Sequence, residues 1–388
     1  MRIKEIREIG IPLEGRIANA VVNFSEHDVS LVAVISDVQR GGRPVAGLAF
    51  NSIGRFAQGG ILRARMIPRV LGAAPDTLLA DDGQRFDPAR VLAAAMRNEK
   101  PGGHGDRAGA AAALELAVWD LNAKLAGEPA HAAIARAYGR DPAPREVDVY
   151  AAGGYYYDAG SGHTLGAELR RYRDMGFDAF KIKIGGAPLA QDVARVEEAL
   201  AVAGDGSRLA ADANGRFDLA TARRYAQALA PYRLRWLEEL GDPLDFRLNR
   251  QIAETYEGAL ATGENLFSLV DAENLAAFGG MRPGRDIFQM DAGLSYGITE
   301  YARMLTMLEA NGYDRRQAYP HGGHLINLHI AVGLGLGGCE AYPGVFQPVG
   351  GYAATCALGG GKVRPSQAPG FGLEEKDELR PAIARILG

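Results

Sequence analysis

Three acidic residues stand at equal intervals along the chain, each at the end of a short apolar run. They are Asp212 in LAADANG, Glu238 in WLEEL and Glu264 in ATGEN, about 26 residues apart. That interval is typical of one strand, one helix and two loops, the repeating unit of a (β/α) barrel. Since the strands of a barrel end on one face, the three carboxylates can meet there. Oxygen ligands on rigid strand ends suit Mg²⁺, so the spacing predicts a magnesium site.

The residue after Glu238 is also acidic, and neighbouring residues of a strand point to opposite faces. Only one of Glu238 and Glu239 can therefore face the predicted metal, and we favour Glu238. Any one of these carboxylates taken alone is more typical of an exposed loop or a helix N-cap. Their common interval after apolar runs makes that alternative the weaker one.

Two lysines, Lys181 and Lys183, close the preceding apolar run FDAFKIKIGG. Residues i and i+2 of a strand share a face, so both ammonium groups are expected to point into the barrel. Proximity of like charges and partial burial both lower a lysine pKa, which would make one of them a general base near neutral pH. Exposed lysines on an edge strand are the alternative, but a closed barrel has no edge strand.

An acidic residue and a histidine end two later strands, Asp291 in QMDAGLSYG and His321 in YPHGGH. A carboxylate on one strand end can hold the imidazole of the next, fixing its tautomer and raising its basicity. We expect this pair to face the metal from the side opposite Lys183. His324 is interpreted as a loop residue or a supporting hydrogen-bond donor.

The pattern along the chain predicts two domains. Residues 1–140 begin with strands and continue with helices, which is typical of an α+β domain, and residues 350–388 are expected to complete it. Residues 141–349 alternate strands and helices, and about eight such units predict a closed parallel barrel. An open doubly wound sheet is the alternative, but no GxGxxG motif follows the first strand of any unit.

Composition argues against several other classes of protein. The 388 residues carry a formal net charge of −4 without a basic block, so nucleic acid is not expected as a partner. The two cysteines form no CxxC motif, which disfavours a disulfide scaffold or a thiolate zinc site. No bilayer-length apolar stretch or signal-peptide core is seen, so we expect a cytoplasmic protein without a membrane partner. We also expect a homo-oligomer.

Together, the KIKIGG segment, the spaced carboxylates and the Asp291–His321 pair resemble the enolase superfamily, in its mandelate racemase subgroup. The resemblance covers nearly the whole chain. It implies an α/β fold, a modified TIM barrel of the (β/α)7β type with an α+β capping domain formed from both ends of the chain. It also implies one Mg²⁺ per active site, with Asp212, Glu238 and Glu264 as its ligands.

The same resemblance implies removal of a proton α to a carboxylate. Lys183 is then the base, and Lys181 contacts the carboxylate and lowers the pKa of Lys183. His321, held by Asp291, is the acid on the opposite face. A lysine and a histidine so placed can equally exchange one α-proton between faces, so an α-hydroxyacid racemase is an alternative, and a non-catalytic homologue is a remote one.

More narrowly, segments such as NEKPGGHG, VYAAGGYYY, ADANGRF, TGENLFS and PHGGH resemble the D-tartrate dehydratases. This implies a small hydroxy-diacid substrate and the conversion of D-tartrate to oxaloacetate and water. Another aldarate or aldonate dehydratase is the alternative. Lys100 is the candidate partner of the distal carboxylate. The other expected substrate contacts are Asn51, Arg55, Tyr156, Asn214 and Glu340.

Overall fold

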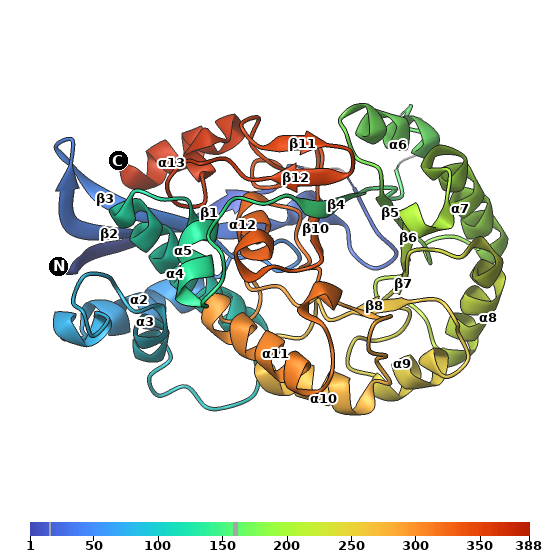
Figure 1. The fold of residues 1–388 in the computed structure, drawn as a ribbon, viewed down its shortest axis with the longest axis horizontal. Coiled ribbons are helices and arrows are strands. Elements are labelled where there is room, and N and C mark those ends of the chain that lie inside the picture. The colour runs from blue at the N-terminus through green and yellow to red at the C-terminus, as the bar shows by residue number, and fades with distance from the viewer. Residues whose placement is uncertain (15–16, 158–161) are drawn as a thin grey trace.

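The computed structural model describes residues 1–14, 17–157 and 162–388. A three-stranded antiparallel sheet forms the base of the cap, in the order β1 (Ile3–Pro12), β2 (Asp28–Arg40) and β3 (Arg43–Phe50). Gly41 and Gly42 both have positive φ, which suits the two-residue turn that joins β2 to β3. The N- and C-termini both lie at the cap end of the molecule (Figure 1).

Helices of the cap pack against this sheet and against one another. They are α1 (Gly59–Ile61), α2 (Ile67–Leu71), α3 (Pro88–Ala95), α4 (Gly105–Ala126) and α5 (Ala130–Ala137). Helix α4 lies along β2 and β3 and ends at Gly127, which adopts the left-handed conformation with φ 72°. Its close approach to β3 depends on Gly47, where a Cβ atom would lie 2.0 Å from the carbonyl oxygen of Ala117.

The second part of the chain is a parallel barrel. Its strands are β4 (Val147–Ala152), β5 (Phe180–Lys183), β6 (Leu209–Asp212), β7 (Leu237–Glu238), β8 (Leu260–Thr262), β9 (Ile287–Phe288) and β10 (Gly338–Ala341). A further strand position lies at Ala318, which pairs with Phe288 and accepts a hydrogen bond of 3.2 Å from the Gly337 N–H. The pairing of β10 with β4 closes the ring, which excludes an open sheet.

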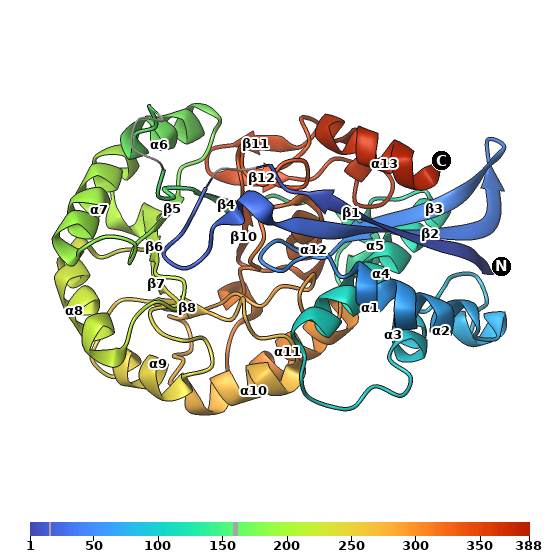
Figure 2. The ribbon, with the colours of Figure 1, turned by 180° about the vertical axis from the view of Figure 1, so that it is seen from behind.

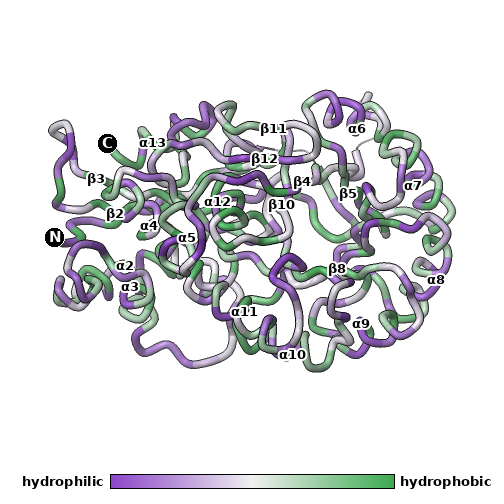
Figure 3. Tube along the Cα trace, in the orientation of Figure 1, coloured by the Kyte–Doolittle hydropathy of each residue, from purple (hydrophilic) through white to green (hydrophobic). Residues whose placement is uncertain are grey.

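Helices connect these strands and form the outer ring (Figure 1). They are α6 (Leu165–Asp174), α7 (Leu189–Ala203), α8 (Leu219–Leu229), α9 (Phe246–Ala253), α10 (Leu269–Phe278), α11 (Ile298–Ala310) and α12 (Leu325–Leu334). The predicted (β/α)7β barrel with a capping domain is confirmed. Hydrophilic residues recur along α6 to α9 (Figure 3), whereas every residue of α12 is buried. Within the described ranges, no helix has the length and apolar character needed to cross a bilayer.

The C-terminal segment contacts both parts of the molecule. Strands β11 (Ala357–Gly359) and β12 (Lys362–Arg364) form a hairpin that extends the barrel sheet at β4. Helix α13 (Arg380–Leu387) then lies beside β1 (Figure 2), where Arg385 donates a hydrogen bond of 2.9 Å to the carbonyl of Gly10. The return of the chain to the cap is therefore seen for α13, while the boundaries at 140 and 350 stay a prediction.

Candidate metal centre and active site

The strand register brings the predicted metal ligands together. Lys183 pairs with Asp212, and Asp212 pairs with Glu238, across β5, β6 and β7. Glu264 follows β8 by two residues. One carboxylate oxygen from each of Asp212, Glu238 and Glu264 lies within 4.8 Å of the others. The three acids spaced along the sequence thus form one cluster at the C-terminal ends of the barrel strands.

The chemistry of this cluster suits a divalent cation. Asp212 and Glu238 are fully buried, and the Glu264 side chain is 16% exposed. Burial and the charge of Asp212 raise the pKa of Glu238. Converging buried carboxylates repel one another, and a hard cation with oxygen ligands relieves that repulsion. The residues therefore fit a bound metal ion at this position.

Glu238 is fixed in place by neutral donors as well as by a lysine. Its Oε2 accepts hydrogen bonds of 2.8 Å from Trp236 Nε1 and 2.7 Å from Gln289 Nε2. Its Oε1 lies 2.5 Å from Lys181 Nζ. The adjacent Glu239 is also buried, but it accepts hydrogen bonds of 2.9 and 3.1 Å from Asn265 Nδ2. Of the two glutamates, Glu238 is therefore the member of the carboxylate cluster, as favoured from the sequence.

Both lysines of β5 point into the barrel, as expected from their spacing. Lys181 Nζ lies 2.8 Å from Glu340 Oε1 and 3.7 Å from Asp212 Oδ2, in addition to its contact with Glu238. Lys183 Nζ lies 2.5 Å from Asp212 Oδ2. The two ammonium groups are buried, with 1% and 6% of the respective residues exposed. The lysine pair is thus an interior feature of the barrel and not a solvated edge.

The expected lowering of the Lys183 pKa is wrong for this structure. Burial lowers the pKa of Lys183, and Lys181 lowers it further, but the carboxylates around it, with Asp212 the strongest, together outweigh both and the pKa is raised. The sequence spacing showed two like charges on one strand. It did not show that the register of the next strand sets a carboxylate beside Lys183.

His321 lies at the other end of the carboxylate row, beside Glu264. Its Nδ1 is 3.5 Å from Asp291 Oδ2, and its Nε2 is 3.6 Å from Glu264 Oε2. Burial lowers the pKa of His321, but Glu264 and Asp291 raise it more, to about 9. Asp291 is itself held by the Gly293 N–H, at 2.7 Å. The structure therefore places the predicted pair side by side, with Lys183 and His321 flanking the cluster.

Two predicted substrate contacts, Glu340 and Asn214, lie at this centre but already bind protein groups. Glu340 Oε1 contacts Lys181, and its Oε2 accepts a hydrogen bond of 2.9 Å from the Gly322 N–H. Asn214 donates to Asp212 through its backbone N–H, at 2.8 Å, and through Nδ2, at 3.2 Å. Both residues hold the lysine and carboxylate groups in position.

The cap loop 51–56 is fastened to the barrel rim. Ser52 Oγ lies 2.9 Å from His324 Nε2, and Arg55 Nη2 donates to Asn265 Oδ1 at 2.6 Å. Arg55 therefore reaches the residue next to Glu264. Asn51, by contrast, is fully buried, and its Oδ1 accepts a hydrogen bond of 2.7 Å from the Ser30 N–H. The structure brings Arg55 to the rim of the site but uses Asn51 inside the cap.

The remaining predicted contacts are not brought to the metal cluster. Lys100 is exposed between α3 and α4, and within the described part of the chain its ammonium group has no hydrogen-bond or ion-pair partner. The hydroxyl of Tyr156 donates to Asp192 Oδ1 at 2.8 Å, and it accepts a hydrogen bond from the Gly186 N–H. Tyr156 thus secures the loop after β5.

Sequence reasoning missed three polar residues of the site: Gln289, Asn265 and Tyr342. Period-two alternation would have found two of them, because Gln289 stands two residues before Asp291 and Tyr342 two residues after Glu340. Asn265 carried no such signal, since its contacts join two loops.

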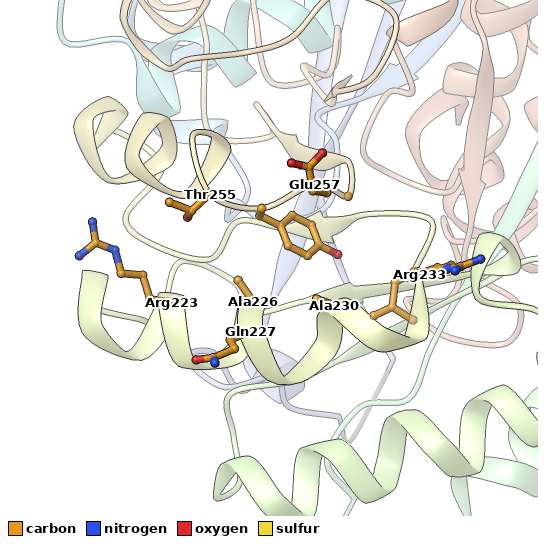
Figure 4. Close-up of a pocket in the computed structure, with 10 residues that line it drawn as sticks. Arg223, Ala226, Gln227, Ala230, Arg233, Thr255 and Glu257 are labelled. Atoms are coloured by element: carbon orange, nitrogen blue, oxygen red, sulfur yellow. The ribbon is translucent and has the colours of Figure 1, made fainter.

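A large surface hollow lies elsewhere. A cavity of about 750 Å³ lies between α8 and α9 (Figure 4), lined by residues that include Arg223, Gln227, Arg233, Tyr256 and Glu257. These residues precede β7 and β8 or end the helices before them, so the cavity faces the N-terminal ends of the strands. Catalytic residues of such barrels lie at the opposite, C-terminal ends. The carboxylate cluster, and not this cavity, is therefore the candidate active site.

The sequence is similar to curated enzymes that act on acid sugars. It is 32% identical over 234 residues to the 3,6-anhydro-α-L-galactonate cycloisomerase of Streptomyces coelicolor, covering 60% of each chain. It is 28% identical over 221 residues to the L-talarate/galactarate dehydratase of Salmonella typhimurium, covering 56% of this chain and 52% of that protein. Each match spans less than two thirds of the relative's own length.

Solved structures share the whole fold. A racemase from Streptomyces coelicolor with bound magnesium superposes with a TM-score of 0.76 at 24% identity, covering 99% of both chains. An L-talarate dehydratase from a Polaromonas species, complexed with Mg and L-glucarate, has a TM-score of 0.74 at 21% identity and covers 95% of this chain and 92% of that one.

Residues 164–379, more than half of the chain, match the family described as Enolase C-terminal domain-like. That segment carries all three acids of the cluster, both lysines, and the Asp291–His321 pair. The chain therefore belongs to this family, within the mandelate racemase/muconate lactonizing enzyme subgroup of the enolase superfamily.

Proposed function

We propose that this protein is a Mg²⁺-dependent acid-sugar dehydratase whose substrate is D-tartrate and whose products are oxaloacetate and water. The observation that carries the proposal is the placement of Lys183 and His321 at opposite ends of the carboxylate row. A base on one side of a substrate and an acid on the other are what removal of an α-proton and loss of a β-hydroxyl require.

Asp212, Glu238 and Glu264 would hold the metal. When bound, Mg²⁺ supplies Lewis-acid stabilisation of the charge that develops on the substrate carboxylate. Asp212 lies 2.5 Å from Lys183 Nζ, so the use of Asp212 as a metal ligand would release Lys183 as a base. Two structural relatives carry magnesium, one of them together with the acid sugar L-glucarate.

The chain's own groups would then move two protons. The neutral amine of Lys183 takes the proton from the carbon α to the carboxylate, and the electron pair of that C–H bond forms an enediolate. Lys181 lies beside the oxygens that gain charge. His321 gives its proton to the β-hydroxyl, the C–O bond breaks and water leaves. The resulting enol becomes oxaloacetate by tautomerisation, and exchange with solvent restores both side chains.

A four-carbon diacid brings a second carboxylate that needs a cationic partner. Arg55 is the predicted cap residue best placed for it, because its guanidinium reaches Asn265 at the rim. Lys100 is the second candidate, from a more distant loop. Asn51, Tyr156, Asn214 and Glu340 would support the site through the contacts described above.

A racemase or cycloisomerase is the second candidate function. Lys183 and His321 on opposite sides of one metal centre can also exchange a single α-proton between faces. Similarity to a cycloisomerase and to a magnesium-containing racemase favours this alternative, and similarity to an L-talarate/galactarate dehydratase favours a longer acid sugar.

The test is a turnover assay of the Mg²⁺-loaded protein in D₂O against the tartrate stereoisomers, galactarate, L-talarate, glucarate and arabinonate. We expect a 2-oxo acid from D-tartrate. Turnover of the longer acid sugars alone would reject the substrate but keep the reaction. Incorporation of α-deuterium with inversion and without loss of water would favour the racemase.

A further inference from the structure

Tyr342 contacts the nitrogen of His321 that faces the carboxylate cluster. Its hydroxyl lies 3.0 Å from His321 Nε2, the same nitrogen that is 3.6 Å from Glu264 Oε2. The other ring nitrogen, Nδ1, is directed to Asp291. Tyr342 therefore touches the atom whose proton the proposed dehydration uses.

Strand β10 and an aromatic cluster fix the position of this phenol. Tyr342 follows Glu340 by two residues, so the two side chains share a face, and Glu340 contacts Lys181. Only 3% of Tyr342 is exposed. Its ring packs against Phe346 at 4.8 Å between centroids, and Phe346 packs against Tyr155 at 6.0 Å. The hydroxyl therefore has little freedom to turn away from His321.

A phenol can serve both protonation states of the imidazole, because it is a donor and an acceptor. When Nδ1 carries the proton, on the side of Asp291 3.5 Å away, a neutral His321 accepts the Tyr342 O–H at Nε2. A protonated His321 donates its Nε2–H to the Tyr342 oxygen. Burial raises the pKa of Tyr342 well above its ordinary value, so the phenol keeps its proton and can act as donor or acceptor.

We propose that Tyr342 is a positioning residue for the acid, whose hydroxyl keeps Nε2 of His321 directed at the metal centre before and after proton transfer. The inference rests on the proposed function for the role of His321. The contact itself needs no substrate, so it can be tested separately.

The first experiment is nitrogen NMR of the substrate-free protein with ¹⁵N-labelled histidine. The chain has seven histidines, and the variant His321→Asn identifies the His321 signal. We expect Tyr342→Phe to shift the Nε2 resonance of His321 and to leave that of His27 in place. The matched control is Tyr172→Phe, which removes another buried hydroxyl, bonded to Glu168 at 2.7 Å, and should not move His321. An unchanged His321 signal in Tyr342→Phe overturns the proposal.

The second experiment separates the two proton transfers with Mg²⁺ and D-tartrate in D₂O. Tyr342→Phe should lower kcat for loss of water by about 10- to 100-fold with little change in KM. Deuterium should accumulate in recovered substrate, because Lys183 still removes the α-proton while the acid step is slow. A kcat equal to that of the parent protein would contradict the positioning role. An equal slowing of deuterium exchange and of dehydration would contradict it as well. Absence of D-tartrate turnover by the parent protein rejects the proposed substrate, and the NMR result still decides the role of Tyr342.

Discussion

Lys183 and His321 are held in different ways, although both flank the same carboxylates. Lys183 has one close carboxylate partner, Asp212 at 2.5 Å. His321 is surrounded by Asp291, Glu264 and Tyr342, at 3.0 to 3.6 Å. The base can thus be freed by a change at a single ligand, whereas the acid is oriented by a preformed set of groups.

We predict that Lys183→Ala lowers turnover at least about 100-fold, the lower end of the range for loss of a general base. Binding of Mg²⁺, measured by calorimetry, should not weaken, because Lys183 is not a ligand and its removal frees Asp212. Asp212→Asn is the matched control and should weaken metal binding. An active Lys183→Ala protein would contradict the assignment of the base.

Helix α4 of the cap connects the cap to the barrel helix α11 through the side chain of Glu115. This fully buried carboxylate accepts hydrogen bonds from the backbone N–H groups of Ile298 and Thr299, at 2.9 and 3.0 Å. It thereby caps the N-terminus of α11, where unpaired donors and the helix dipole favour a negative charge. Gly297 has φ 90°, and a Cβ atom there would lie 2.1 Å from Glu115 Oε2, so the contact requires glycine.

We therefore expect Glu115→Ala to lower the free energy of unfolding by about 3 kcal/mol, since buried donors lose their acceptor. Urea denaturation followed by circular dichroism measures this loss. Glu254→Ala, at the exposed end of α9, removes only a surface pair with Arg250 and should cost less than about 0.5 kcal/mol. An equal loss of unfolding free energy in the two variants would show that Glu115 does not stabilise the contact between the cap and the barrel.

Across the whole molecule, acid stability depends on a buried histidine pair between α5 and α12. The backbone N–H of His131 donates to His329 Nδ1 at 3.2 Å. In the described part of the chain, both ring nitrogens of His131 and Nε2 of His329 have no hydrogen-bond partner. Burial lowers the pKa of both, to about 4 for His131 and about 3 for His329. The folded protein therefore keeps both rings neutral at pH values where the unfolded chain protonates them.

Because these folded pKa values lie below the unfolded value of about 6.5, the pair's contribution is complete above pH 6.5 and is lost as pH falls towards 4. Each histidine can reduce the free energy of unfolding by up to about 1.4 kcal/mol per pH unit in that window. Urea midpoints at pH 7.5 and 5.5 measure the slope. His329→Asn keeps an acceptor for the backbone N–H of His131. It should reduce the dependence of the free energy of unfolding on pH by the contribution of one histidine. An unchanged slope would contradict this account.

The sequence allowed the barrel and the metal cluster to be predicted, because β/α units have a regular length and their strand ends meet on one face. The strand register behind the Lys183–Asp212 pair was not visible in it. Loop residues were harder, since Asn51 and Arg55 belong to one polar segment, yet the first is fully buried and the second reaches Asn265. Pairing of loops from different domains follows from three-dimensional packing and not from local pattern.

The junction between cap and barrel has an evolutionary consequence. Ser52 of the cap loop and His324 of the barrel share one buried hydrogen bond, and Arg55 and Asn265 share another at the rim. A replacement at one position of either pair leaves the polar group at the other position without its hydrogen-bond partner. Positions 52 and 324, and positions 55 and 265, should therefore covary among relatives, and a graft of the cap loop into another barrel should carry both barrel partners with it.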